Sequence, residues 1–389
     1  MSSCKVRQLS EDGAGDVKSR LSSVDILKGA AIIGVVLAHL VLIQNQSEFG
    51  EASFEIGELF YAALPMFFVL SGYFYRPCTV KENLRARVFP LVLGLIVGTI
   101  VLTVTMYLYL LPLGYDLSDS DLWGDIAQII IGKGSFQDMY DPNYTGGDIL
   151  DVFEVTLPVY FIQVMVVGYL IFLPIAEFVM KDWRRAVITI FFLLSITCAY
   201  MELFHIQLPF YAQLGPLVAS FYITGAYLGK YKVAEYLERG FREKKYWIVF
   251  IIFLVAALLC IQFFPTRMAL IYSKFGDYGG YSVFSFYTLT MACGIVLMYA
   301  AALVSHVKWV TSILTLVGRE TLYIFFLHIF VAKMLVAPFV TLDVQSWIPI
   351  DSLPQSILLA IITIALIVIA VMLFRRIKSK NKPIVSYQK

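Results

Sequence analysis

Two ionisable side chains, Lys28 and His39, interrupt the first long apolar segment of the chain, residues 24–44. They are eleven residues apart, which places them on one face of a helix, about 16 Å apart along its axis. Ionisable groups inside a membrane helix are costly and indicate a functional site. An imidazole titrates near pH ~6.5 and can take a proton from a hydroxyl group. The pair predicts acid–base chemistry with His39 as the base; the structural alternative is a buried histidine bonded to a neighbouring helix.

A second histidine lies in a later apolar segment, residues 312–337. If this segment is one straight helix, His328 lies about sixteen residues into it along the chain, close to the depth of His39. Arg319 precedes His328 by nine residues and is therefore expected on the opposite side of that helix. Arg319 and Glu320 would then lie near the depth of Lys28, where a charge pair can form.

A basic stretch follows the second apolar segment, residues 57–75. Its cations are Arg76, Lys81, Arg85 and Arg87. The planar guanidinium group suits paired contacts to phosphate oxygens, so the stretch predicts contact with phosphates. The alternative is a basic connection that only sets the membrane topology. Within the preceding segment, Ser71 and Gly72 are small enough to allow close helix approach.

One connection, residues 112–156, is much longer than the others. It is rich in acidic residues, and Asp148, Asp151 and Glu154 lie nearest to the following apolar segment. Loops of this length are usually functional or disordered. Carboxylates, amides and aromatic rings would suit a sugar, which is bound by hydrogen bonds and stacking. The alternative is an acidic loop that merely follows membrane topology.

The composition indicates a membrane protein. Hydrophobic residues make up 59% of the 389 residues and charged residues only 15%, and the mean hydropathy of +0.78 is far from that of a soluble chain. Apolar runs of about twenty residues, enough to cross a ~30 Å hydrocarbon core, recur along the whole chain. We predict an all-α bundle of about ten membrane-spanning helices: 24–44, 57–75, 88–111, 157–178, 186–204, 214–230, 246–264, 283–304, 312–337 and 355–374.

Basic residues concentrate in alternate connections. If the N-terminus is cytoplasmic, nearly all of them fall on the inner side, as the positive-inside rule requires, and the outer connections hold only Lys133, Arg267 and Lys274. Both termini are therefore predicted to be cytoplasmic. The predicted organisation is a tail 1–22, a membrane domain 23–376 with the extracytoplasmic loop 112–156, and a tail 377–389. The scattered cysteines predict no metal site, and no basic-aromatic patch indicates nucleic acid.

Five segments resemble, in order, the motifs of acyltransferase family 3, the integral-membrane sugar O-acyltransferases. The segment Asp25–His39 is similar to the family's first-helix signature, a basic residue, ten further residues and a histidine. Four other segments resemble later motifs: Pro65–Tyr75, Arg87–Pro90, Leu157–Ile162 and Gly318–His328. The resemblance extends from residue 22 to about residue 330, and ten helices fit the family.

Three positions depart from the family pattern. Lys28 stands where arginine is commoner, a form that resembles the fucose-4-O-acetylase-like branch, and lysine lacks bidentate geometry. Arg85 and Arg87 are separated by one residue, whereas the family pattern has two between its arginines. Tyr160 stands where tryptophan is usual.

The resemblance implies transfer of an acyl group, expected to be acetyl, from cytoplasmic acetyl-CoA to a hydroxyl of an extracytoplasmic or lipid-linked carbohydrate. His39 would be the general base, a role favoured over an acyl-histidine relay, and His328 would orient the acceptor or stabilise charge. The donor site would comprise Lys28, Ser71, Arg76, Arg85, Arg87 and Arg319. The acceptor side would comprise Asp148, Asp151, Glu154 and Tyr160.

Two other functional classes stay open at this point. A secondary transporter of a sugar or organic acid would use intramembrane charges as a proton relay, although we find no internal repeat halves of the kind common in transporters. A receptor or scaffold could retain the fold without catalysis. The resemblance implies a multi-pass protein of the plasma membrane in contact with lipid and a glycan acceptor. Whether it works alone or in a polysaccharide-assembly complex is left open.

Overall fold

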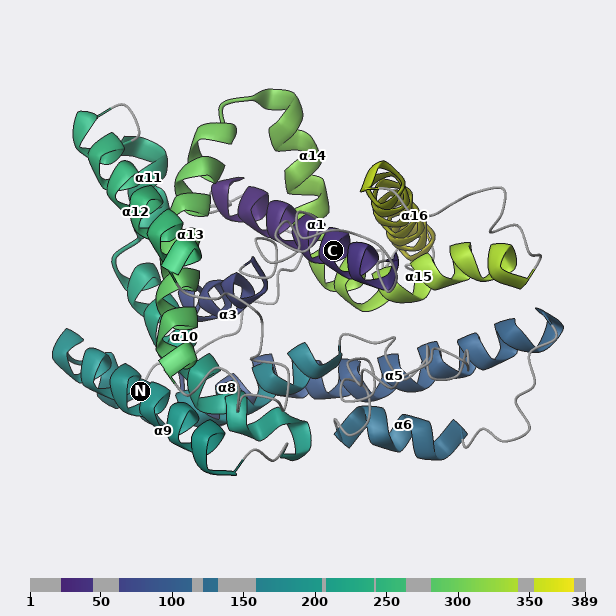
Figure 1. Ribbon diagram of the computed structural model, residues 1–389, viewed down its shortest axis with the longest axis horizontal. Coiled ribbons are helices and arrows are strands. Elements are labelled where there is room, and N and C mark those ends of the chain that lie inside the picture. Colours follow the sequence, from purple (N-terminus) through teal and green to yellow (C-terminus); the bar gives the residue numbers. More distant parts are fainter. Residues whose placement is uncertain are drawn as a thin grey trace, which may run out of the picture.

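The computed structural model describes residues 22–44, 63–113, 122–131, 159–204, 208–240, 243–263, 281–341 and 353–380. All regular elements in these ranges are helical (Figure 1). The first group is α1 (Ser22–Gln44), α3 (Ala63–Tyr73), α4 (Val80–Asn83), the π-helical turn η1 (Leu84–Val88), α5 (Phe89–Leu110), the short turn η2 (Leu111–Leu113) and α6 (Leu122–Ile131). The middle group is α8 (Val159–Val179), α9 (Trp183–Phe204), the 3₁₀ turn η4 (Pro209–Leu214), α10 (Gly215–Lys230) and α11 (Val233–Gly240). The last group is α12 (Lys244–Phe263), α13 (Tyr281–Val304), α14 (Lys308–Arg319), α15 (Thr321–Thr341) and α16 (Leu353–Lys380).

Each of the ten predicted apolar segments contains a helix. In the described part of the chain, five helices are long and apolar enough to cross a membrane, and a sixth span results if the bent pair α14–α15 is counted as one. The other predicted segments correspond to α1, α3, α10 and α12, of which α3 is described over only eleven residues. Ten spans and cytoplasmic termini therefore stay predictions, whereas the all-helical class is confirmed for the described residues.

The third predicted segment begins earlier than expected. The sequence predicts a helix from residue 88, but helical structure starts at Val80, because Thr79 and Glu82 form a reciprocal capping box there. A proline within a helix lacks a donor and clashes with the carbonyl four residues before it. The wider turn η1 directly precedes Pro90, and its closing bond runs from the Phe89 N–H to the Leu84 carbonyl. Arg85 and Arg87 thus lie on a π-helical turn, which often marks a functional site.

Helix α10 forms the centre of the bundle. It packs against α3, α8 and α9, and Phe221 and Tyr222 on it are fully buried. Its approach to α3 is so close that a Cβ atom added at Gly225 would overlap the Val69 carbonyl oxygen. Small residues permit such contact between membrane helices. The contact places the end of α3 firmly against the bundle centre.

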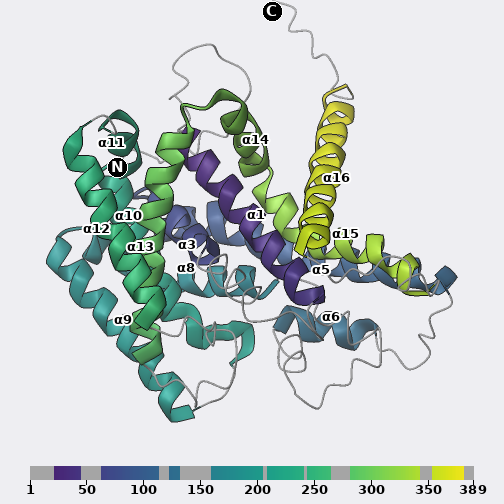
Figure 2. The same ribbon diagram turned by 45° about the horizontal axis from the view of Figure 1, so that its top comes forward.

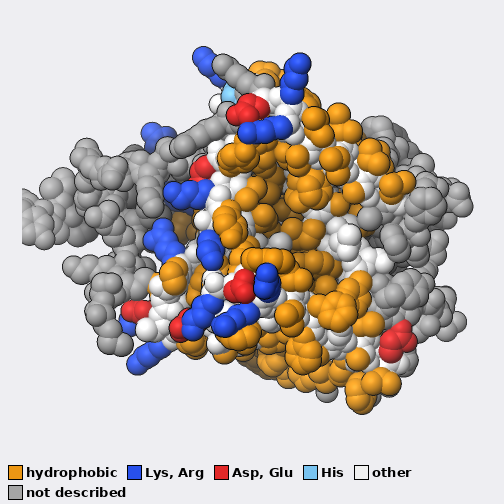
Figure 3. All heavy atoms as spheres, turned by 90° about the vertical axis from the view of Figure 1, so that its left-hand side faces the viewer, with side chains coloured by type: hydrophobic (Ala, Val, Ile, Leu, Met, Phe, Trp, Pro, Cys, Tyr) orange, Lys and Arg blue, Asp and Glu red, His pale blue; other side chains and the backbone are white. Residues whose placement is uncertain are grey.

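A broad apolar surface covers the side of the molecule that α9 and α12 form. Figure 3 shows this surface with Lys and Arg side chains gathered along one border. Its exposed apolar side chains include Ile188, Phe191 and Phe192 of α9 and Ile248, Ile251 and Ile252 of α12. Basic residues occur where these helices begin, at Arg184 and Arg185 and at Lys244 and Lys245. A lipid-facing belt with a basic border is typical of a helical membrane protein.

Helix α15, which carries His328, lies between three other helices. It contacts α1, α5 and α16, and Figures 1 and 2 show α5 running alongside it. The Tyr109 hydroxyl of α5 donates to the Met334 carbonyl of α15 over 2.8 Å. The two predicted histidines therefore lie on helices α1 and α15 that touch each other.

Candidate active site

The helices α1 and α14 cross with their backbones in contact. A Cβ atom added at Gly318 would overlap the Asp25 carbonyl oxygen, and one added at Gly29 would overlap the Leu314 carbonyl oxygen. Glycine is therefore required at both positions for this approach. The crossing brings the start of α1 next to the end of α14, and with it Asp25 next to Arg319.

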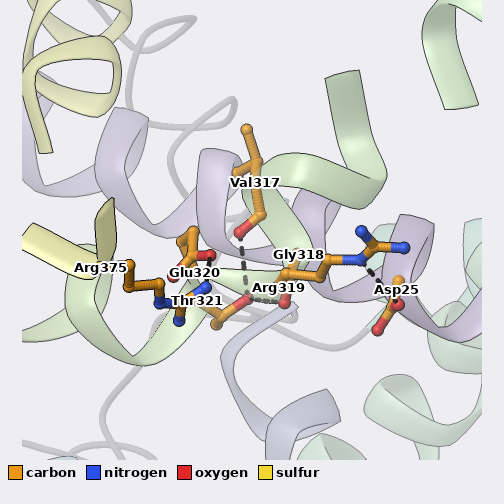
Figure 4. Close-up of polar contacts among 7 residues, drawn as sticks. All are labelled: Asp25, Val317, Gly318, Arg319, Glu320, Thr321 and Arg375. Carbon is orange, nitrogen blue, oxygen red and sulfur yellow. Dashed lines mark hydrogen bonds and ion pairs between the residues drawn. The ribbon is translucent and has the colours of Figure 1, made fainter. Parts of the chain in front are cut away.

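Arg319 and Glu320, neighbours at the junction of α14 and α15, form ion pairs with two different helices (Figure 4). The Arg319 Nε atom lies 3.9 Å from the Asp25 carboxylate of α1. Glu320 accepts a hydrogen bond from Arg375 of α16. Both carboxylates are buried, Asp25 to 3% exposure and Glu320 to 2%. Because a buried carboxylate is costly unless it is paired with a cation, these two pairs hold α1 and α16 to the α14–α15 junction.

The junction is also where the sequence prediction of one straight helix, residues 312–337, is wrong. The chain bends by 79° between α14 and α15. The Glu320 N–H bonds the Val317 carbonyl only three residues back, and the Thr321 hydroxyl donates to the Gly318 carbonyl over 2.7 Å. These bonds satisfy carbonyls at the end of α14 and terminate it. The rotation of 100° per residue cannot be continued across the bend, so the predicted orientation of His328 relative to Arg319 does not hold. The membrane depth inferred for His328 from one straight helix does not hold either.

Only part of the Arg319 guanidinium contacts Asp25. Asp25 contacts it at Nε, which leaves Nη1 and Nη2 without a partner among the residues that the structure describes. The side chain is half exposed. Two adjacent N–H-bearing atoms of this kind match the oxygens of a phosphate. Lys28, one helical turn beyond Asp25 on α1, lies on the same face as that carboxylate.

A second group of predicted residues meets at the end of α3. The Arg87 Nη1 atom donates to the Ser71 carbonyl over 3.3 Å and to the Tyr169 hydroxyl over 3.4 Å, and its Nη2 atom donates to the Phe74 carbonyl. The Lys28 ammonium lies 5.0 Å from the centre of the Phe74 ring. Lys28, Ser71 and Arg87, which are far apart in the sequence, thus surround one short stretch of backbone.

Arg87 consequently has a structural role that Arg85 does not share. We expect Arg87→Ala to lower the stability of the folded protein by about 1–3 kcal/mol, because it removes charged hydrogen bonds to carbonyls at the end of α3. Arg85 is exposed, and Arg85→Ala should leave stability unchanged. Thermal unfolding of both variants in detergent micelles measures the difference. Equal melting temperatures for Arg87→Ala and the wild type would contradict this role.

Arg76 and Arg85 complete the predicted donor group on the same part of the chain. Both side chains are exposed, and they lie on the two sides of α4, in the segment 74–79 and on η1. Neither forms a hydrogen bond or an ion pair with the residues that the structure describes. A bound anion would reach these two side chains at the exposed surface of the protein.

His328 is completely buried, and its ring orientation can be assigned. The Nδ1 atom lies 3.0 Å from the Ile324 carbonyl oxygen and 2.9 Å from that of Phe325. Carbonyl oxygens only accept hydrogen bonds, so Nδ1 carries the proton in the neutral ring and Nε2 carries the lone pair. Nε2 is therefore the atom of His328 that can accept a hydrogen bond or take up a proton.

This assignment gives a specific prediction for His328→Asn. The asparagine amide nitrogen can replace the Nδ1 donor, so we expect normal amounts of folded protein, whereas loss of Nε2 should reduce acyl transfer at least about tenfold. His328→Leu removes both functions and should also lower the folded yield. The two are compared by size-exclusion chromatography and by transfer rate. A fully active His328→Asn protein would restrict His328 to a packing role.

The remaining predicted residues are described to different extents. His39 lies on α1, and its side chain is outside the described part of the structure. Asp148, Asp151 and Glu154 lie outside the described residues altogether. Tyr160 is buried in the first turn of α8, and its ring packs edge-on against Tyr211 of η4, with 6.0 Å between the ring centres.

Sequence reasoning missed the partners of the predicted residues. Asp25, Arg375 and Tyr169 were not selected, although they contact Arg319, Glu320 and Arg87 respectively. A polar side chain in an otherwise apolar helix was the available signal for Tyr169. Within the described residues, no group of three His, Cys, Asp or Glu side chains is arranged to hold a metal ion.

Comparison with protein-family models identifies an acyltransferase domain, matched over residues 21–374. No curated protein and no solved structure shows a significant match. The matched range includes all helices from α1 to α15 and most of α16, and members of the family are integral membrane proteins. Both the Asp25–Arg319 crossing and the cations around the α3 end lie within it. The chain therefore belongs to acyltransferase family 3.

Proposed function

We propose that this membrane acyltransferase moves an acetyl group from acetyl-CoA to a hydroxyl of an extracytoplasmic or lipid-linked carbohydrate at the plasma membrane. The observation that carries the proposal is that Lys28 lies both beside the Asp25–Arg319 contact and beside the end of α3 that Arg87 holds in place. In an acyltransferase, a cationic cluster at one end of the bundle suits the phosphates of the acyl donor.

The donor side is supported by charge and by geometry. Arg319 offers Nη1 and Nη2, and Lys28 adds a point charge one turn from the carboxylate that holds Arg319. Arg76 and Arg85 are exposed on the two sides of α4 and would contact outer phosphates of the donor. Arg87 mainly supports the backbone of the site, since its guanidinium is bonded to α3 carbonyls.

The reacting group then has to reach His39. The side chain of Lys28 and that of His39 start about 16 Å apart along α1, a distance that an extended acyl-pantetheine arm can cover. His39 takes the proton of the acceptor hydroxyl as its oxygen attacks the thioester carbonyl. The new C–O bond forms, the C–S bond breaks, and the proton passes to the departing sulfur, so that the products are an ester and free CoA. His328, with Nε2 as acceptor, would orient the hydroxyl.

Transfer and transport are distinguished by one pair of measurements. Membranes that contain the wild-type protein are incubated with [¹⁴C]acetyl-CoA, and the label in the glycan fraction is counted against membranes without the protein. Sealed vesicles are tested in parallel for uptake of labelled sugar without acetyl-CoA. We expect label in the glycan and no protein-dependent uptake. Uptake without acetyl transfer would overturn the proposal in favour of a transporter.

A further inference from the structure

A buried amide joins helices α8 and α6. Gln163 of α8 is only 1% exposed, and its side-chain Nε2 atom donates to the carbonyls of Ile129 and Ile130 at the end of α6, each over 2.8 Å. Both donors of the amide are thereby used. Because carbonyls accept and cannot donate, the two ends of the amide are assigned without ambiguity.

The oxygen of this amide is a hydrogen-bond acceptor to which no described group donates. Gln163 Oε1 is buried and has no hydrogen-bond partner among the described residues. A buried polar atom without a partner costs about 1–3 kcal/mol, and such atoms in native proteins call for an explanation. A bound molecule that donates a hydrogen bond would remove the cost.

Two tyrosine rings lie at the same end of α8. Tyr160 lies three residues before Gln163 and so faces the same side of the helix. Its ring packs on that of Tyr211, which is also buried. The turn η4 contacts both α6 and α8, and the Gln163 hydrogen bonds join α8 to α6, so the amide and both tyrosines belong to one region.

The backbone of η4 is strained at this place. Phe210 and Tyr211 have φ angles of 57° and 51°, in the left-handed region that residues with a side chain rarely adopt. Such conformations cost of order 1–3 kcal/mol each and are concentrated at ligand-binding sites. The Leu208 N–H, bonded to Gln213 Oε1 over 3.0 Å, helps to hold the turn.

We propose that Gln163, Tyr160 and Tyr211 form a binding subsite for the carbohydrate acceptor, in which Gln163 Oε1 accepts a hydrogen bond from a sugar hydroxyl. This deepens the proposed function and rests on it for the role of the sugar as acceptor. A neutral hydroxyl matches an amide oxygen, and tyrosine rings suit the apolar C–H face of a sugar. The sequence places all three elements toward the predicted extracytoplasmic side, opposite the donor-binding cations.

The subsite is tested by glycoside binding and by transfer on the same purified protein in nanodiscs. The probes are p-nitrophenyl glycosides of glucose, galactose and fucose, with binding followed by saturation-transfer NMR. We expect Gln163→Met to weaken binding about three- to tenfold, the loss of one neutral hydrogen bond, and to leave the KM for acetyl-CoA unchanged. Gln355→Met on α16 is the matched control and should bind as the wild type does.

The outcomes separate the subsite from the proposed function. If Gln163→Met binds a glycoside more weakly than the wild type does, but neither transfers acetyl, the subsite stands and the transferase reaction fails. If transfer occurs and Gln163→Met keeps the wild-type binding and acceptor KM, the subsite is wrong. Should Gln163→Met fail to fold, Tyr160→Leu decides: it removes one of the two rings that would contact the sugar, and unchanged glycoside binding would overturn the proposal.

Discussion

Replacing His39 by alanine is expected to reduce acetyl transfer by about 10²–10⁴-fold, the contribution typical of a positioned general base. Without the imidazole, α1 carries no base in the part of the helix around position 39, since its carboxylate, Asp25, lies at the start of the helix and contacts Arg319. Since α1 is anchored by its crossing with α14 at Gly29 and Gly318, the folded amount should change little. Initial rates with [¹⁴C]acetyl-CoA at saturating acceptor measure the loss.

A matched histidine provides the control. His306 is exposed in the bend between α13 and α14, and His306→Ala should keep the full transfer rate. If His39→Ala retained the rate of the wild type, His39 would not be the base, and the tautomer of His328 would make its Nε2 atom the next candidate. A general loss in both variants would point to instability instead, which size-exclusion chromatography detects.

Replacing Gly318 by valine is expected to destabilise the protein by about 3 kcal/mol or more and to abolish acetyl transfer. The added Cβ would overlap the Asp25 carbonyl oxygen, and a backbone atom cannot move aside as a flexible side chain does. The helices α1 and α14 would have to separate, which breaks the Asp25–Arg319 contact (Figure 4). Thermal unfolding and the transfer assay on the same preparation record both effects.

Gly94→Ala is the control for the addition of a Cβ atom to a helix glycine. A Cβ atom at Gly94 would meet only the Phe326 ring, at an ordinary contact distance of 3.9 Å, so stability and activity should be close to those of the wild type. A Gly318→Val protein with the melting temperature and activity of the wild type would show that the close crossing of α1 and α14 is dispensable.

The junction between α14 and α15 shows where prediction from the hydrophobic pattern ends. Residues 312–337 are apolar enough for one helix, and nothing in their spacing indicates a bend. The bend depends on the Glu320 pairing with Arg375, a residue fifty-five positions away, and on the Thr321 hydroxyl. Local propensity is too weak to decide against such tertiary contacts.

The cations proposed for the donor side could be selected from the sequence, but their contacts could not. Lys28 and Arg87 stand out because cations are rare in a chain with 15% charged residues, and the structure brings both to Phe74. That Arg87 is bonded to carbonyls of α3 could not be inferred, because a basic residue near a helix end has the same appearance in a sequence whether it meets protein or ligand. His39 stays a prediction from its spacing to Lys28 and from the family motif.

The sequence by itself determined the helical membrane class, the approximate helix positions and the family, because each depends on the length of apolar runs and on short motifs along the chain. Only the tertiary structure decided which side chains meet. The Asp25–Arg319 pair requires two glycines in separate helices to touch, and the buried acceptor of Gln163 requires α6 to take its donors. These are contacts between different helices. The hydrophobic pattern predicts which face of a helix is buried, but it does not identify the helix that packs against that face.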